Sequence, residues 1–77
     1  MIIKVYPGSM VTCTGLDEDG NIEVEDATTI RELLGLIKVP VLLRPLILVS
    51  VNGMKVDRNY KFEQGDAVSF MMPIAGG

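Results

Sequence analysis

A single amphipathic helix, placed between segments typical of β-strands, is the feature that most constrains the fold of this chain. Its apolar positions are spaced at helical intervals and form one stripe, which consists of Ile30, Leu33, Leu34 and Ile37. Thr29 and Glu32 match a capping box, in which each side chain accepts a hydrogen bond from the other residue's backbone N–H. The helix is therefore predicted over residues 29–38, before Pro40, because a proline cannot continue it. The apolar stripe must be buried against a sheet.

The segments around this helix have the alternation and composition of strands. They are residues 2–6, 22–25, 46–51, 54–56 and 67–72. Residues 10–14 are a further candidate for an extended segment. Asn52-Gly53 is typical of a type I′ hairpin turn, because both central residues of that turn need positive φ. The first and last strands are the most apolar of each half of the chain, so we expect them to pair in parallel at the centre of a sheet.

Two hairpins on either side of one helix predict an α+β protein with the β-grasp (ubiquitin-like) arrangement. We expect a mixed sheet of four to five strands packed on the helix. The domain is predicted over residues 1–72, and residues 73–77 are predicted to form an extended C-terminal tail. Residues 46–51 begin apolar on both faces, which predicts a central strand.

Length and composition limit the classes of function. The 77 residues are enough for one domain, and their apolar runs are shorter than the roughly 18–20 residues that a membrane span needs. The formal charge is −3 and the basic residues are scattered, so we expect no nucleic-acid partner. The acidic stretch 17–26 is either a solvated loop and edge strand or a docking surface for a basic partner. No basic region precedes an apolar block, so we expect no signal peptide and a cytoplasmic location.

Catalysis by side chains of this chain is not expected. The sequence has no histidine and one cysteine, which excludes metal sites built on those ligands and Ser/His or Cys/His nucleophile pairs. Cys13 is interpreted as an ordinary strand residue. No glycine-rich phosphate loop precedes the helix. We expect no metal, no cofactor bound by this chain, and no enzyme activity of its own.

The last two residues, Gly76 and Gly77, indicate a different kind of chemistry. Residues without Cβ leave a thin and conformationally free segment that can enter a narrow channel. The tail reaches at most roughly 16–18 Å beyond residue 72, which is far enough to place the carboxylate of Gly77 inside another protein's active site. A carboxylate is inert until one oxygen becomes a leaving group, so a partner must activate it, most simply by adenylation with ATP and Mg²⁺. The alternative is a terminus without a function.

Three pieces of sequence together resemble one known family. They are Asn52-Gly53 after an apolar strand, the turn and strand start at residues 63–68 (EQGDAV), and the ending at residues 73–77 (PIAGG). This combination looks like the MoaD/ThiS family of ubiquitin-like sulfur carrier proteins, which have a β-grasp fold and a terminal Gly-Gly. The resemblance is strongest over residues 46–77 and extends to the helix and the opening strand.

The resemblance implies a carrier cycle. An E1-like adenylyltransferase would adenylate the carboxylate of Gly77, and a persulfide sulfur donor would convert it to a thiocarboxylate. A sulfur-accepting synthase would then use that sulfur. In this reading Gly77 is the acceptor of the adenylate and of the sulfur, Gly76 lets the tail thread into the partner, and ATP and Mg²⁺ are used by the activating partner.

Several alternatives stay open. The ending at residues 74–77 is similar to the type that supplies the thiazole of thiamine, whereas Pro73 and the length resemble the type that supplies molybdopterin. The connection 7–21 fits neither type well. Other functions are a ubiquitin-like protein modifier conjugated through Gly77 and a non-catalytic β-grasp interaction domain.

Partner binding is expected to need exposed apolar residues near the tail. Met71, Ile74 and Ala75 are the candidates, and Met72 is a further one for which core packing is the alternative. Strand alternation predicts that Met71 is exposed and that Met72 is buried beside Val68 and Phe70. The apolar connection at residues 39–46 either packs into the core or forms an exposed partner-binding patch, and an apolar patch can also bury itself in a homodimer.

Overall fold

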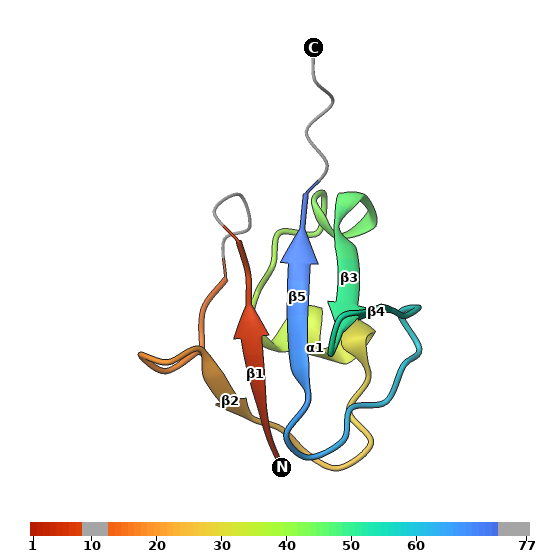
Figure 1. Cartoon of the computed structure of the whole chain (residues 1–77). Coiled ribbons are helices and arrows are strands. Elements are labelled where there is room, and N and C mark those ends of the chain that lie inside the picture. Colours follow the sequence, from red (N-terminus) through yellow and green to blue (C-terminus); the bar gives the residue numbers. More distant parts are fainter. Residues whose placement is uncertain (9–12, 73–77) are drawn as a thin grey trace.

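Five strands form one mixed sheet, and a single helix covers one of its faces (Figure 1). The computed structural model describes residues 1–8 and 13–72. The elements in chain order are β1 (Ile2–Tyr6), β2 (Asn21–Glu23), α1 (Ile30–Leu36), the 3₁₀ turn η1 (Arg44–Leu46), β3 (Leu48–Val51), β4 (Met54–Lys55) and β5 (Ala67–Met71). The strand order across the sheet is β2-β1-β5-β3-β4. This is the predicted α+β, β-grasp arrangement.

The pairing of the strands follows the prediction. β1 and β5 are parallel and lie next to each other in the middle of the sheet, whereas all other neighbouring strands are antiparallel. Asn52 and Gly53 join β3 to β4 with φ values of 52° and 83°, so both have the positive φ that a type I′ turn requires. β5 is therefore the central strand, paired with β1 over residues 67–69 and with β3 over residues 68–71.

The helix forms for the reasons that its sequence indicates. The backbone N–H of Glu32 donates to Thr29 Oγ1 at 3.2 Å, and the backbone N–H of Thr29 donates to Glu32 Oε1 at 3.2 Å, which completes the capping box. The predicted apolar stripe is buried, and it packs with the helix side of the sheet into one core. The core consists of Ile3, Val5, Val24, Ile30, Leu33, Leu34, Ile37, Val39, Ile47, Val49, Val51, Phe62, Val68 and Phe70.

The helix stops earlier than Pro40 requires. Lys38 has a φ of 58°, in the left-handed region. Its N–H donates to the carbonyl of Gly35 and the N–H of Val39 donates to the carbonyl of Leu34, at 3.2 and 3.1 Å. These two bonds form a Schellman motif, which satisfies carbonyls that the last helical turn leaves free. The helix thus ends through its own cap, and Pro40 follows that end.

Other boundaries also differ from the prediction. Residues 44–46 form η1, so the strand predicted from residue 46 begins at Leu48. This strand, β3, has a neighbouring strand on each side, but only one of its faces is buried, because Leu48 on the other face is exposed. The predicted strands 54–56 and 67–72 are β4 and β5, each one residue shorter at its end, whereas the predicted strand 22–25 is β2, which begins one residue earlier and ends two residues earlier.

The predicted extended segment at residues 10–14 is only partly covered by the structure. Residues 10–12 lie outside the described residues, and Cys13 and Thr14 are not in a strand. The interpretation of Cys13 as a strand residue is therefore wrong. Its side chain is half-buried and packs against the core, which raises the pKa of the thiol above its ordinary value.

Candidate functional site

The end of the central strand β5 is the part of the molecule from which the predicted functional tail leaves. Met71, the last residue of β5, pairs with Leu48, the first residue of the antiparallel neighbour β3. Residues 73–77, and with them the predicted site residues Ile74, Ala75, Gly76 and Gly77, lie outside the described residues. What the structure describes is the surface around the base of the tail.

The two methionines at this position differ as strand alternation predicts. The Met71 side chain is 65% exposed on the sheet face that the helix does not cover. Met72 is half-buried and packs against the core, although it is not fully buried. The exposure of Met71 is confirmed, and its role in partner binding stays a prediction.

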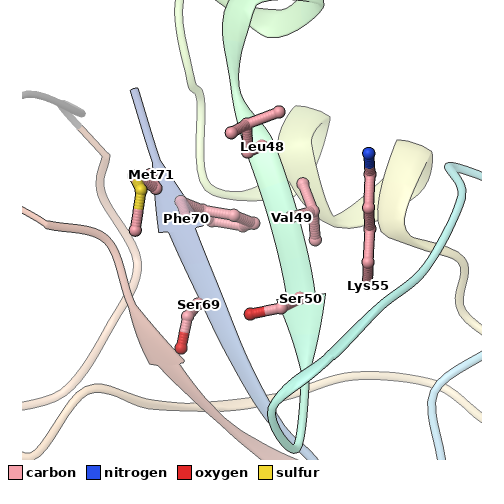
Figure 2. Close-up of a pocket in the computed structure, with 7 residues that line it drawn as sticks. All are labelled: Leu48, Val49, Ser50, Lys55, Ser69, Phe70 and Met71. Atoms are coloured by element: carbon pink, nitrogen blue, oxygen red, sulfur yellow. The ribbon is translucent and has the colours of Figure 1, made fainter. Parts of the chain in front are cut away.

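The helix-free face of the sheet is apolar at this end and more polar below it. Leu48 and Met71 form a cross-strand apolar pair, and the next row across the sheet is Lys55, Ser50, Ser69 and Tyr6. Between β3 and β5 lies an open hollow of about 250 Å³, whose lining residues are Leu48, Val49, Ser50, Lys55, Ser69, Phe70 and Met71 (Figure 2). This volume is below the roughly 300–1,000 Å³ of small-molecule sites, so the hollow is better suited to a side chain of a partner protein.

The connection between α1 and β3 adds more exposed apolar surface at the same end of the sheet (Figure 1). Val41, Leu42 and Leu46 are 69%, 86% and 55% exposed, whereas Val39 is buried in the core. The two alternatives for residues 39–46 therefore apply to different residues. Val39 packs into the core, and the other three side chains are exposed.

Two arginines hold this connection in place. Arg44 Nε donates to the carbonyl of Val39 at 2.9 Å. Arg58 Nη2 donates to the carbonyls of Arg44 and Ile47, both at 2.7 Å. These charge-assisted hydrogen bonds add to the backbone hydrogen bonds of the successive turns between Pro40 and Ile47 and fix the path of the connection. Arg58 is a positioning residue that the sequence reading did not find, because its partners lie 11 and 14 positions away along the chain.

A buried carboxylate at the other end of β5 was also not found from the sequence. Asp66 is 5% exposed, and its oxygens accept hydrogen bonds from the Tyr60 hydroxyl at 2.8 Å, the Glu63 N–H at 2.9 Å and the Asn52 amide at 3.0 Å. Burial alone raises the pKa of Asp66, but the three hydrogen bonds to the charged form lower the pKa by more, so the net pKa lies below its ordinary value. The bond to Asp66 raises the pKa of Tyr60 to about 12, with burial and the nearby charge of Glu63 adding to it.

This carboxylate has a structural role. All of its donors come from the chain itself, and they join the β3–β4 turn, the 57–63 loop and the start of β5. Within the described residues, no buried side-chain nitrogen or oxygen lacks a hydrogen-bond partner. Asp66 is therefore a satisfied anchor and not a candidate acid or base.

Residues 1–8 and 13–72, which the structure describes, offer neither a cluster of metal ligands nor a helix that could cross a membrane. This part of the chain has no cluster of three or more Cys, Asp or Glu side chains placed to hold a metal ion. It also contains no helix of the length and hydropathy needed to cross a membrane.

Comparison with solved structures gives two close folds. The crystal structure of SAMP1 from Haloferax volcanii superposes with a TM-score of 0.68 at 16% identity, and 100% of each chain is covered. A chain from the complex of subunits 1 and 2 of molybdopterin-converting factor from Helicobacter pylori 26695 gives a TM-score of 0.61 at 18% identity, again over 100% of each chain. At these identities the likeness concerns the fold.

Comparison with protein families is more specific. No curated protein matches the chain. The model of the ThiS family matches residues 5–77, which is nearly the whole chain and includes the end of β5, the surface around it and the tail. The chain therefore belongs to the ThiS family, and it is a ubiquitin-like sulfur carrier of the general kind that its sequence resembles.

Proposed function

We propose that this chain carries sulfur as a thiocarboxylate on Gly77. The observation that supports the proposal most directly is the family match, which extends through residues 73–77. The structure adds a physical reason. The central strand of the sheet leads into the tail at a rim of exposed apolar side chains, so a partner that binds this rim receives the tail in a defined position.

The chemistry requires activation of the Gly77 carboxylate by a partner. An oxygen of the carboxylate attacks the α-phosphorus of ATP, pyrophosphate leaves, and an acyl adenylate forms on an E1-like enzyme that holds ATP and Mg²⁺. The terminal sulfur of a persulfide donor then attacks the acyl carbon, and AMP leaves. A thiol of the partner attacks the resulting acyl disulfide at the donor's sulfur, which releases the thiocarboxylate and leaves a disulfide between donor and thiol.

This chain supplies position, and its partners supply the catalytic groups. Its own contribution is a rigid body, an apolar rim for recognition and a tail thin enough to enter a channel. In this proposal Gly77 carries the reacting carbon, and Gly76 provides the narrow approach. Met71, Ile74 and Ala75 are the proposed contacts of the tail base with a partner.

The sulfur acceptor is proposed to be a synthase of cofactor biosynthesis. One structural neighbour comes from a complex of two molybdopterin-converting factor subunits, which supports a two-protein assembly of carrier and synthase. The match to the ThiS family supports thiazole formation for thiamine as the other pathway. Both acceptors use the same thiocarboxylate, so the carrier step is tested first.

The test is the intact mass of the protein after incubation with an E1-like enzyme, ATP, Mg²⁺ and a persulfide donor. The expected result is a mass gain that matches replacement of one oxygen by sulfur in the full chain. The matched control lacks only Gly77, keeps the folded body, and is expected to gain nothing.

Two results would contradict the proposal. If the folded full chain and the control both keep their mass while the enzyme adenylates another carrier, the tail is not an acceptor. If the full chain instead accumulates as an adduct joined to a lysine of another protein, conjugation is its function.

A further inference from the structure

The helix-free face of the sheet carries a charge opposite to that of the whole protein. The chain has 10 acidic and 7 basic residues and a formal charge of −3. The strand positions of this face nevertheless include Lys4 and Lys55, and their one carboxylate is Glu23 on the edge strand β2. The half of the face around β5, β3 and β4 is thus apolar and cationic.

The two lysines on this face differ in their surroundings. Lys4 is half-buried, and its ammonium lies over the ring of Tyr6 at 5.4 Å from the centroid. This cation–π contact gives the Lys4 ammonium a partner within the chain. Lys55 is exposed on the short edge strand β4 and lines the hollow between β3 and β5. Figure 2 shows its side chain extending from the level of Ser50 toward that of Leu48.

The hollow combines three kinds of contact. Leu48 and Met71 provide exposed apolar surface, Ser50 and Ser69 face each other as hydroxyl-bearing partners across β3 and β5, and Lys55 provides a positive charge at the rim. A side chain that fills the apolar part places the residues beside it next to the Lys55 ammonium. An acidic residue at that position gains an ion pair, and a basic one is repelled.

We propose that Lys55 selects the activating partner by pairing with a carboxylate that lies next to an apolar side chain inserted between Leu48 and Met71. The inference rests on the proposed function, and it names the chemistry of the partner surface. The adenylating enzyme is the occupant, because it is the partner that binds the chain with its carboxylate still free. The positive charge of Lys55 complements an acidic partner surface, which the net negative charge of the carrier would otherwise repel.

The test is the dissociation constant for the E1-like enzyme, measured by calorimetry at low and at high salt. Lys55→Gln is expected to weaken binding by about three- to fivefold, and Lys55→Glu by about tenfold or more, because the reversal adds repulsion. Lys55→Arg should bind like the wild type. Higher salt should weaken the wild type more than Lys55→Gln, since the variant has lost the screened pair.

Lys61→Glu is the matched control. It makes the same charge change at another exposed lysine, one that does not line the hollow. Its affinity is expected to stay close to that of the wild type. A partner variant in which the pairing carboxylate is replaced by lysine should restore binding to Lys55→Glu and weaken binding to the wild type.

The outcomes separate this inference from the proposed function. If all Lys55 variants bind like the wild type, or if Lys61→Glu weakens binding equally, the inference is wrong even when the wild type gains sulfur. If the chain itself forms a dimer that Lys55→Glu abolishes, a second copy is the occupant and the inference is also wrong. An enzyme that binds through Lys55 but transfers no sulfur supports this inference and contradicts the carrier function.

Discussion

The two ends of β5 differ in how completely the chain satisfies its own surface. Asp66, directly before the strand, is 5% exposed and has every contact that its carboxylate needs from the chain itself. Met71, the last residue of the strand, is 65% exposed and is paired with Leu48, which is also exposed. One end is closed by polar contacts, and the other leaves apolar side chains exposed.

The difference separates the residues expected to govern stability from those proposed to govern recognition. A buried carboxylate with three donors fixes loops that are far apart in sequence, which stabilises the body from which the tail extends. Exposed apolar side chains contribute little to folding but much to association once a partner removes them from water. Substitutions at the start of β5 should therefore change stability, and those at its end should change binding.

Apart from the loss of a core side chain, the largest effect is expected from Asp66→Ala. The change removes the charged acceptor of three hydrogen bonds that join separate segments of the chain, which should lower the free energy of unfolding by about 3 kcal/mol. Urea unfolding followed by circular dichroism measures this loss. Asp66→Asn, which keeps the shape and one acceptor oxygen, should lose less, and an equal loss in both variants would show that the charge is what matters.

A smaller effect is expected from Tyr60→Phe, and it depends on pH. The pKa of Tyr60 is about 12 in the folded protein against an ordinary value of 10.0, so its bond to Asp66 contributes stability below pH 10 that is lost as the pH rises through 12. Near neutral pH the variant should be less stable by about 1 kcal/mol, because Tyr60 is only half-buried and water replaces part of the bond. The two proteins should converge above pH 12. A constant difference between pH 8 and 12 would contradict the role of this hydroxyl.

The parts of the fold that could be predicted have local signals. The capping box of Thr29 and Glu32 and the Asn52-Gly53 turn are read within four residues, and the structure has both. The sequence does not predict the helix end at the Lys38 cap. A left-handed residue after a helix is usually Gly or Asn, and Pro40 is the residue that the sequence marks as unable to continue the helix.

The parts that could not be predicted depend on contacts between distant residues. Asn52 was recognised for its turn, but its side chain also reaches Asp66, 14 positions away. The apolar run from Leu46 predicts a strand from that residue. In the structure Leu46 ends η1, and Arg58 donates to the carbonyls of Arg44 and Ile47 and so holds this 3₁₀ turn. The candidate site is divided in the same way. Gly76 and Gly77 are visible in the sequence, but the hollow beside Lys55 exists only once β3, β4 and β5 are paired.

The smallest effect on stability, and the sharpest test of the comparison, is expected from Met71→Ser. Met71 is 65% exposed, so the free energy of unfolding should change by less than about 0.5 kcal/mol, whereas Phe70→Ala, one position earlier and in the core, should cost about 3–5 kcal/mol. Binding to the E1-like enzyme should weaken by about tenfold, because a partner loses apolar contact at the base of the tail.

Met54→Ser is the control for this prediction. Met54 is 71% exposed on β4 and does not line the hollow, so its substitution should change neither stability nor affinity. Equal affinity losses at both methionines would mean that general surface hydrophobicity drives association. A loss at Met71 alone assigns recognition to the end of β5, and a large loss of stability at Met71 would mean that this end supports the fold as the Asp66 end does.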